Sequence, residues 1–303
     1  MQSVKTTFSI KDLETLGGIK AHTIRIWEKR YHLLQPDRTD TNIRTYSITD
    51  LQKLLNVSFL VNHDHKISSV AKLSTEEIAA KVRDLATAKK EKLHTTAIND
   101  FKLAMLNFDR SVFDKTYNDA KKEHDFDTVF TKIFIPLLNE IGMLWQTDTI
   151  NPAHEHFISN LIMQKLLLEI EKCPNPKSEV AHKIHVLYLP LNEIHELGLM
   201  YLNYKISKAG YPVVYLGQNI QVESLNYFAK HHPDTRFITY LTIQPENSIA
   251  DYAQLFNETL NTKKLPLYML GRKANMEKST ELPGNAKVFE SIETFAKTLE
   301  NHE

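Results

Sequence analysis

Cysteine is almost absent from this sequence. Cys173 is the single cysteine among 303 residues, which excludes an intrachain disulfide framework and favours a cytoplasmic location. The most apolar stretch, residues 134–145, is interrupted by Asn139 and Glu140, so it lacks the pattern of a membrane span. Residues 1–14 alternate polar and charged side chains, which is not the pattern of a signal peptide. We therefore expect a cytoplasmic protein with no membrane contact.

Net charge is also absent. The 37 basic and 37 acidic side chains cancel, which excludes a protein that binds polyanions over its whole surface but allows one local basic patch. Apolar residues make up 42% and charged residues 24%, the composition of an ordinary globular protein and not of a disordered one. The sequence has no G-x-G-x-x-G and no P-loop, so dinucleotide and nucleoside triphosphate binding lose support.

Three segments differ in pattern and predict three domains. Residues 1–84 show short helical patterns separated by turns, residues 93–173 carry apolar stripes of period 3.6, and residues 180–303 alternate apolar runs with amphipathic stretches. Residues 85–96, rich in Lys and Ala, predict an exposed hinge or a helix extension. Residues 174–178 (Pro-Asn-Pro-Lys-Ser) predict a linker.

The first segment has the pattern of a helix-turn-helix. An apolar stripe with Ser9 as N-cap predicts a helix over residues 10–16. Gly17-Gly18 then forces a turn, and residues 20–30 predict a second, basic helix.

A wing and a third helix are expected next. The polar residues 37–45, after Pro36, fit a hairpin wing, and residues 49–62 predict a helix with Thr49 as its N-cap. Residues 18–46 hold six basic side chains against three acidic ones, a local net charge of +3. A solvated basic helix on a small helical domain would have the same charge. If the segment binds DNA, groove contacts are expected from Arg25 and Lys29, and phosphate contacts from Arg38, Arg44 and Tyr46.

The order of residues resembles that of the MerR family of winged-helix transcription regulators. The matching runs within residues 8–80 are Ile10 to Leu13, Gly18 to Tyr31, Pro36 to Thr39, Asn42 to Arg44, and Tyr46. The resemblance implies a dimer on pseudo-palindromic double-stranded promoter DNA, with Ile24, Trp27 and Tyr31 in the core. It implies DNA contacts at His22, Thr23, Arg25, Arg38, Arg44 and Tyr46, to which the charge of the helix adds Lys20, Lys29 and Arg30.

The middle segment predicts an antiparallel four-helix bundle, which by itself says nothing about function. The expected helices cover residues 95–108, 110–122, 126–147 and 153–172. Trp145, at the end of the third helix, and Glu155-His156, at the start of the fourth, would meet at one rim of the bundle. A buried Trp with a surface Glu-His pair is the alternative. A metal site at His154, Glu155 and His156 is disfavoured, because positions i and i+2 of a helix face different directions.

The third segment predicts a doubly wound parallel sheet of the flavodoxin-like (Rossmann-type) class, whose ligands bind at the carboxyl ends of the strands. Strands are expected at residues 184–189, 213–216, 237–243, 265–270 and 288–289, and helices at 193–208, 221–231, 247–260 and 291–301. The fold class is therefore multidomain, with α and α/β parts.

The loop after the first strand contains Glu193-x-His195-x-x-Gly198. The His195 imidazole is a good metal ligand, a carboxylate two residues away would fix its tautomer, and Gly198 would leave room for a bulky planar ligand. An exposed His at a helix start is the alternative.

A four-helix bundle followed by this motif in a flavodoxin-like domain resembles the cobalamin-binding module. The resemblance implies that His195 is the lower axial ligand of the cobalt. Trp145, nine residues, Glu155 and His156 resemble the motif that covers the upper face in light-sensing regulators of the CarA/CarH/LitR type. In those proteins adenosylcobalamin drives tetramer formation and operator binding, and light releases the DNA.

Three positions depart from that family. Its Ser-x-Leu, which lines the cleft for the cobalamin tail, aligns with Tyr240-Leu241-Thr242, and its Gly-Gly aligns with Leu270-Gly271. Tyr240 and Leu270 are expected to crowd that cleft, with Tyr240, Thr242 and Gly271 at the cofactor. Gln146 stands where a cobalt-capping His often follows the Trp in light sensors, and it is a poor cobalt ligand.

Three functions are consistent with the pattern. The first is a transcription repressor, not an enzyme, that senses cobalamin, in particular adenosylcobalamin, and responds to light. The second is a regulator whose cobalamin-like module has lost the cofactor and binds a protein or another ligand. The third is a cobalamin enzyme subunit, which the DNA-binding head and the absence of a substrate barrel disfavour.

Overall fold

The computed structural model divides into two compact units, residues 1–162 and 163–303, and each is considered by itself. The structure describes residues 7–39, 42–62, 64–88, 90–146, 150–178, 183–260, 265–278 and 281–300. Among these, the side chains of residues 15, 83–93, 143–149 and 300 lie outside the description.

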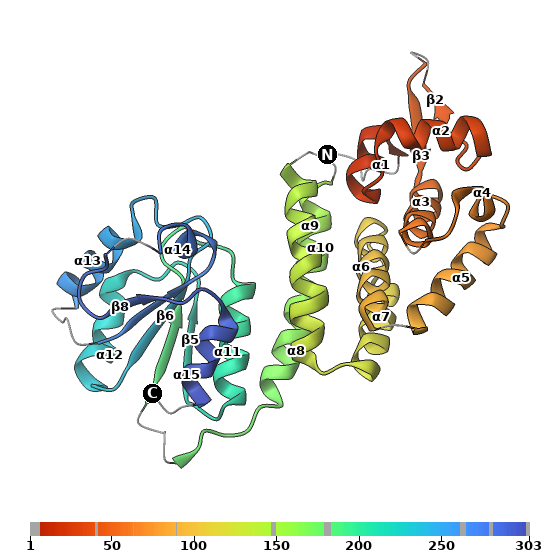
Figure 1. Cartoon of the computed structure of the whole chain (residues 1–303). Coiled ribbons are helices and arrows are strands. Elements are labelled where there is room, and N and C mark those ends of the chain that lie inside the picture. Colours follow the sequence, from red (N-terminus) through yellow and green to blue (C-terminus); the bar gives the residue numbers. More distant parts are fainter. Residues whose placement is uncertain are drawn as a thin grey trace. The chain divides into compact units, whose positions relative to one another are not determined.

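The N-terminal head has the expected helix-turn-helix and wing (Figure 1). Ser9 caps the first helix in a reciprocal capping box with Asp12, and Gly18 ends it in the left-handed conformation at φ 68°. The strand order of the small antiparallel sheet is β1-β3-β2. The elements are β1 (Thr7–Phe8), α1 (Ile10–Gly17), α2 (Ala21–Tyr31), β2 (Asp37–Arg38), β3 (Arg44–Ser47), α3 (Ile48–Val61), α4 (Ile67–Val70) and α5 (Thr75–Ala88).

The third helix of the head begins earlier than predicted. Ser47, and not Thr49, is the N-cap of α3, because its hydroxyl accepts from the backbone N–H of Asp50 while the Asp50 carboxylate accepts from the N–H of Ser47. Two capping candidates lie near each other in the sequence, and the one with an acidic residue three positions later has both bonds.

The bundle segment is helical, as expected. Its elements are α6 (Lys90–Leu106), α7 (Arg110–Glu123), α8 (Phe126–Val129), a π-helical turn (Phe130–Phe134), α9 (Ile135–Gln146) and α10 (Pro152–Glu171). Phe101, Phe113 and Phe134 form an aromatic core, with ring centroids 4.9 Å apart for Phe101–Phe113 and 5.3 Å for Phe101–Phe134. The segment 85–96 is built into α5 and α6 apart from residue 89, which lies outside the description, so the helix extension is the correct alternative.

The C-terminal unit contains the predicted parallel sheet, with strand order β5-β4-β6-β7-β8, the flavodoxin-like order. Figure 1 shows α11 and α15 on one face of the sheet and α12 and α13 on the other. Every residue of β4 is buried because helices cover both faces. The elements are β4 (His185–Tyr188), α11 (Leu197–Lys208), β5 (Val213–Gly217), a 3₁₀ turn (Val222–Leu225), α12 (Asn226–His231), β6 (Arg236–Tyr240), α13 (Ile249–Thr259), β7 (Leu267–Leu270), α14 (Arg272–Met276), β8 (Ala286–Val288) and α15 (Ile292–Glu300).

The predicted helix over residues 193–208 is too long at its start. Helix α11 begins only at Leu197, because residues 190–196 form a loop whose backbone bonds to a side chain instead of to a helix. Among the described residues, no helix combines the length and apolarity needed to cross a membrane. Strand β4 has β5 on one side and β6 on the other, so the loop after β4 lies where the strand order reverses.

His185, at the start of β4, makes the stability of this unit depend on pH. Its ring is fully buried and packs edge-to-face on Tyr211, with centroids 5.1 Å apart. Burial, followed by the nearby charge of Arg236, lowers the pKa of His185 from 6.5 to about 3. The unfolded chain therefore binds one more proton between these pH values, and folding stability falls as pH falls through that window.

We expect His185→Leu to flatten the fall in unfolding free energy between about pH 6 and pH 4, because the single extra proton contributes a slope of at most about 1.4 kcal/mol per pH unit. Denaturant unfolding at a series of pH values measures it. Substitution of His231, an exposed histidine of α12, by Leu is the control and should leave the slope as in the wild type. Parallel curves for wild type and His185→Leu would contradict the assignment.

Candidate functional sites

Helix α2 presents a basic outer face. His22, Arg25, Lys29 and Arg30 are exposed on it, Lys20 is exposed just before it, and Thr23 is half-buried. Ile24 and Trp27 lie in the core, as predicted, with 0% and 6% of their surface exposed, whereas Tyr31 is only half-buried. The predicted groove contacts thus share the solvent side of the second helix of a helix-turn-helix.

The wing is tied to α2 by Glu28, which the sequence reasoning had not singled out. Glu28 Oε2 accepts from Nε of Arg44 at 3.2 Å, and Oε1 accepts from the hydroxyl of Tyr46. Burial, then the hydrogen bond to Glu28, raises the pKa of Tyr46. The prediction that Tyr46 contacts phosphate is therefore wrong: its ring is fully buried and its hydroxyl is engaged within the head. The sequence gives only a weak indication of this role for Glu28, because an acidic residue in a basic helix could equally form an ion pair on the surface.

Arg38 remains an exposed residue of the wing. Its Nη1 donates to Oδ1 of Asn42 at 2.5 Å, across the turn between β2 and β3. Arg44 is half-buried and oriented by Glu28. Phosphate contact by Arg38 and Arg44 stays a prediction.

At the rim of the bundle only part of the predicted cluster is described. Glu155 and His156 contact each other, with Oε2 and Nδ1 3.0 Å apart, and Glu155 also accepts from Ser159 at 2.6 Å. His154 is buried and stacks on Phe108, whereas the side chain of His156 is 73% exposed, so the two histidines face different directions. The side chains of Trp145 and Gln146 lie outside the described residues, and convergence with Trp145 stays a prediction.

The strongest constellation lies in the loop after β4, around the carboxylate of Glu193. Oε2 of this fully buried side chain accepts from three consecutive backbone N–H groups, those of residues 242–244, at 2.9, 2.9 and 3.0 Å. Oε1 accepts from the N–H groups of Ile194 and His195 at 3.1 and 3.0 Å. The same oxygen lies 2.6 Å from Nδ1 of His195. One carboxylate therefore joins the loops that follow β4 and β6.

This arrangement decides the state of His195. Burial by itself would raise the pKa of Glu193, but the hydrogen bonds from His195 and the backbone outweigh it and lower the pKa to about 2. An ionised carboxylate only accepts, so Nδ1 of His195 carries a proton and Nε2 is the nitrogen suited to bind a metal. The His195 side chain is 47% exposed, at the carboxyl edge of the sheet. The predicted pairing of Glu193 with His195 is confirmed.

Three exposed apolar side chains lie on the two loops that Glu193 joins. Leu191 and Ile194 on the β4 loop and Ile243 on the β6 loop are 47%, 60% and 55% exposed. We call these three residues the apolar rim. Large exposed apolar side chains gathered beside a polar group are typical of a binding surface.

Gly198 does not leave the open space that was predicted. A Cβ atom on Gly198 would lie 2.5 Å from Cε1 and 2.6 Å from Cζ of Tyr240, so the tyrosine ring takes that space. Gly271 has a φ of +101°, and a Cβ there would overlap the backbone of Leu241. Leu270 is fully buried in the sheet. Thr242 reaches the site through its backbone N–H, which bonds to Glu193.

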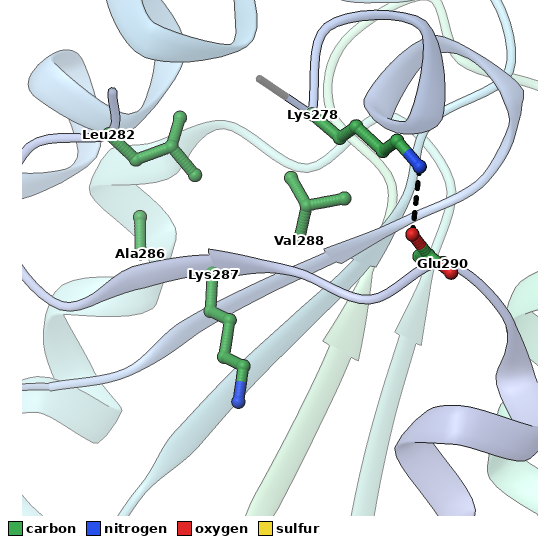
Figure 2. A pocket seen from close by; sticks show the side chains of 6 residues that line it. All are labelled: Lys278, Leu282, Ala286, Lys287, Val288 and Glu290. Atoms are coloured by element: carbon green, nitrogen blue, oxygen red, sulfur yellow. Dashed lines mark hydrogen bonds and ion pairs between the residues drawn. The ribbon is translucent and has the colours of Figure 1, made fainter. Parts of the chain in front are cut away.

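A separate hollow of about 410 Å³ lies at the far edge of the sheet (Figure 2). It is bounded by Leu282, Val288 and a 2.8 Å ion pair between Lys278 and Glu290, while Lys287 points to the other side of β8. Strand β8 is three positions from β4 in the sheet, so the hollow is not part of the site around His195. Among the described residues, no group of three His, Cys, Asp or Glu side chains is placed to hold a metal ion.

Two segments of the chain match models of known protein families. Residues 8–77 match the model of the MerR HTH family regulatory protein, and residues 97–168 match that of the B12 binding domain. The HTH-type transcriptional repressor CarH of Myxococcus xanthus is 26% identical over 223 residues, 72% of this chain and 73% of that protein. The repressor CarA of the same organism is 25% identical over 222 residues, 72% of this chain and 71% of that protein.

A solved structure shares the fold of about two thirds of this chain. The monomethylamine corrinoid protein of Methanosarcina barkeri superposes with a TM-score of 0.53 at 15% identity, over 67% of this chain and 96% of that chain. One part of the chain thus matches a MerR-type head and another a domain of the B12-binding type, and the full-length relatives that share both regions are described as transcriptional repressors.

We expect Glu193→Ala to destabilise the C-terminal unit by about 3 kcal/mol or more, because it leaves several buried backbone N–H groups without an acceptor. Denaturant unfolding followed by circular dichroism measures the change. Glu246→Ala, at an exposed glutamate just beyond the β6 loop, is the control and should stay within about 0.5 kcal/mol of wild type. Equal losses for the two variants would contradict a linking role for Glu193.

Proposed function

We propose that this MerR-type regulator is a cytoplasmic repressor that binds pseudo-palindromic promoter DNA as a homo-oligomer, a dimer or a tetramer, and that its C-terminal module binds adenosylcobalamin. The repressor role is supported by the relatives CarH and CarA, both described as transcriptional repressors. The observation that carries the cofactor is the buried Glu193 that holds Nδ1 of His195.

The head supplies the DNA contacts in this proposal. Arg25 and Lys29 are exposed one turn apart on α2, and Arg38 is exposed on the wing. Phosphate contacts by such cations release counterions, so the affinity falls with salt. Glu28 holds Arg44 beside α2, which fixes the wing relative to the helix that enters the groove.

The residues around His195 suit a corrinoid in three respects. The half-exposed imidazole is fixed by a buried carboxylate in the tautomer that leaves Nε2 for cobalt. The apolar rim offers a surface for a large planar ring. The site lies at the reversal of strand order, where ligands of doubly wound sheets bind. Cobalamin, if bound, would supply a cobalt ion, and the His195 imidazole would be the side chain that holds it.

A module without cofactor is the second candidate, because the exposed apolar rim also suits a protein partner and Tyr240 occupies the space beside Gly198. Release of DNA by light is a further prediction. Illumination of the cobalamin-bound protein on its operator tests it, with retention of DNA as the outcome against it.

For the head, we expect Arg25→Ala and Lys29→Ala each to weaken operator binding by about tenfold or more, and the logarithm of the affinity to fall with the logarithm of salt at a slope of about −4 to −5 per bound unit. Fluorescence anisotropy with labelled operator DNA measures both. Lys230→Ala, at an exposed lysine of α12, is the matched control. An operator affinity that is unchanged in both variants would refute this interface.

For the module, we expect purified wild type mixed with adenosylcobalamin in the dark to keep its colour after desalting, and His195→Ala to bind at least about tenfold more weakly, because the axial ligand is lost. Visible absorption measures the bound fraction, and circular dichroism checks that the variant is folded. His231→Ala, at an exposed histidine, is the control. A colourless wild type would reject the cofactor and favour a partner-binding module.

A further inference from the structure

We propose that Tyr240 is the residue that sets the corrinoid specificity of this site: its ring disfavours ligands that carry a lower nucleotide tail. The inference rests on the proposed binding of a corrinoid through His195. It concerns Tyr240, a residue near His195, and not the bond between His195 and the cobalt.

Tyr240 is the last residue of β6, the strand that pairs with β4 at the point where the strand order reverses. Its ring lies against the backbone at the start of α11, since a single Cβ on Gly198 would come within 2.5 to 2.7 Å of three ring atoms. The space beside Gly198 is therefore taken by the tyrosine ring, and a ligand group enters that space only if the ring moves.

Neighbouring positions are themselves closely packed. Thr239, Leu241 and Leu270 are fully buried in the sheet. A Cβ on Gly271 would overlap the Leu241 backbone, so that glycine too is in contact with the chain itself. Tyr240 is the bulky side chain that packs against Gly198, three positions after His195.

The position of the ring matters because of the geometry of cobalamin itself. In free cobalamin the base of the nucleotide tail occupies the lower axial position of the cobalt. A protein imidazole takes that position only when the base leaves, and the tail then hangs from the face that is turned toward the protein. Below His195 it needs room, and the tyrosine ring occupies the space beside Gly198.

The ring is held by packing and not by a polar anchor. Within the described part of the chain, no hydrogen bond to the Tyr240 hydroxyl is present, and burial followed by the charge of Glu293 raises the pKa of that hydroxyl. A side chain held by packing alone is displaced by ligand at a cost in affinity. Tail-bearing corrinoids carry that cost, whereas tail-less ones do not.

Two ligands of the same cobalt state test the proposal: hydroxocobalamin, which has the tail, and diaquacobinamide, which lacks it. Equilibrium dialysis and visible spectra of the full-length protein give the affinities and report whether an imidazole binds the cobalt. The wild type is expected to bind diaquacobinamide at least about tenfold more tightly than hydroxocobalamin, a difference of about 1.4 kcal/mol. Tyr240→Ser should abolish or reverse this preference by improving hydroxocobalamin binding.

Three further variants separate ring volume from other effects. Tyr240→Phe keeps the ring and should keep the wild-type preference, while Tyr240→Leu replaces Tyr240→Ser if the latter does not fold. Tyr227→Ser, at an exposed tyrosine of α12, is the matched control and should behave as wild type. Loss of the preference in Tyr240→Phe would overturn the steric role.

The outcomes distinguish the two proposals. Equal binding of both corrinoids by the wild type, unchanged in Tyr240→Ser, overturns the role of Tyr240 and leaves cobalamin binding intact. Failure of every variant to bind either corrinoid rejects the corrinoid site itself, and the inference falls with it. Tighter binding of hydroxocobalamin by Tyr240→Ser than by the wild type, with the affinity for diaquacobinamide unchanged, supports the inference.

Discussion

A single buried carboxylate organises the C-terminal site. Glu193 accepts hydrogen bonds from its own loop, from the imidazole of His195 and from three consecutive amides of the loop after β6. A charge without exposed surface is tolerable only because so many donors surround it. The hydrogen bonds that stabilise this charge also join the two loops at the edge of the sheet. The Glu193 carboxylate therefore both holds the loops and fixes the tautomer of His195.

The head uses the same principle at smaller scale. Glu28, with a side chain only 10% exposed, bonds to Arg44 and Tyr46 and so couples α2 to the wing. In both places a mostly or fully buried acid positions a more exposed, functionally suited group: an arginine for phosphate in the head, an imidazole for a metal in the module. The exposed groups are those that sequence motifs reveal, whereas the acids behind them decide the geometry.

The shape of the site beside Gly198 depends on a residue that is distant in the sequence. The glycine is present, and its open side is taken by Tyr240 from a strand more than forty residues later in the chain. A close approach of ring to backbone of this kind is available only at glycine. The space at this point is therefore set by a pair of residues, Gly198, which has no side chain, and Tyr240, which supplies a ring.

Local patterns in the sequence determined much of the molecule. The caps and turns around α1, the helical stripes of the bundle and the alternation of strands and helices follow from short-range chemistry, and they predicted the fold class together with the Glu193–His195 pair. The start of α11, the burial of Tyr46 and the bonds from residues 242–244 to Glu193 depend on chain segments brought together only in space. Tyr46 and Tyr240 show the reason: a tyrosine is amphipathic, and only its neighbours in the folded chain decide whether it faces solvent, ligand or core.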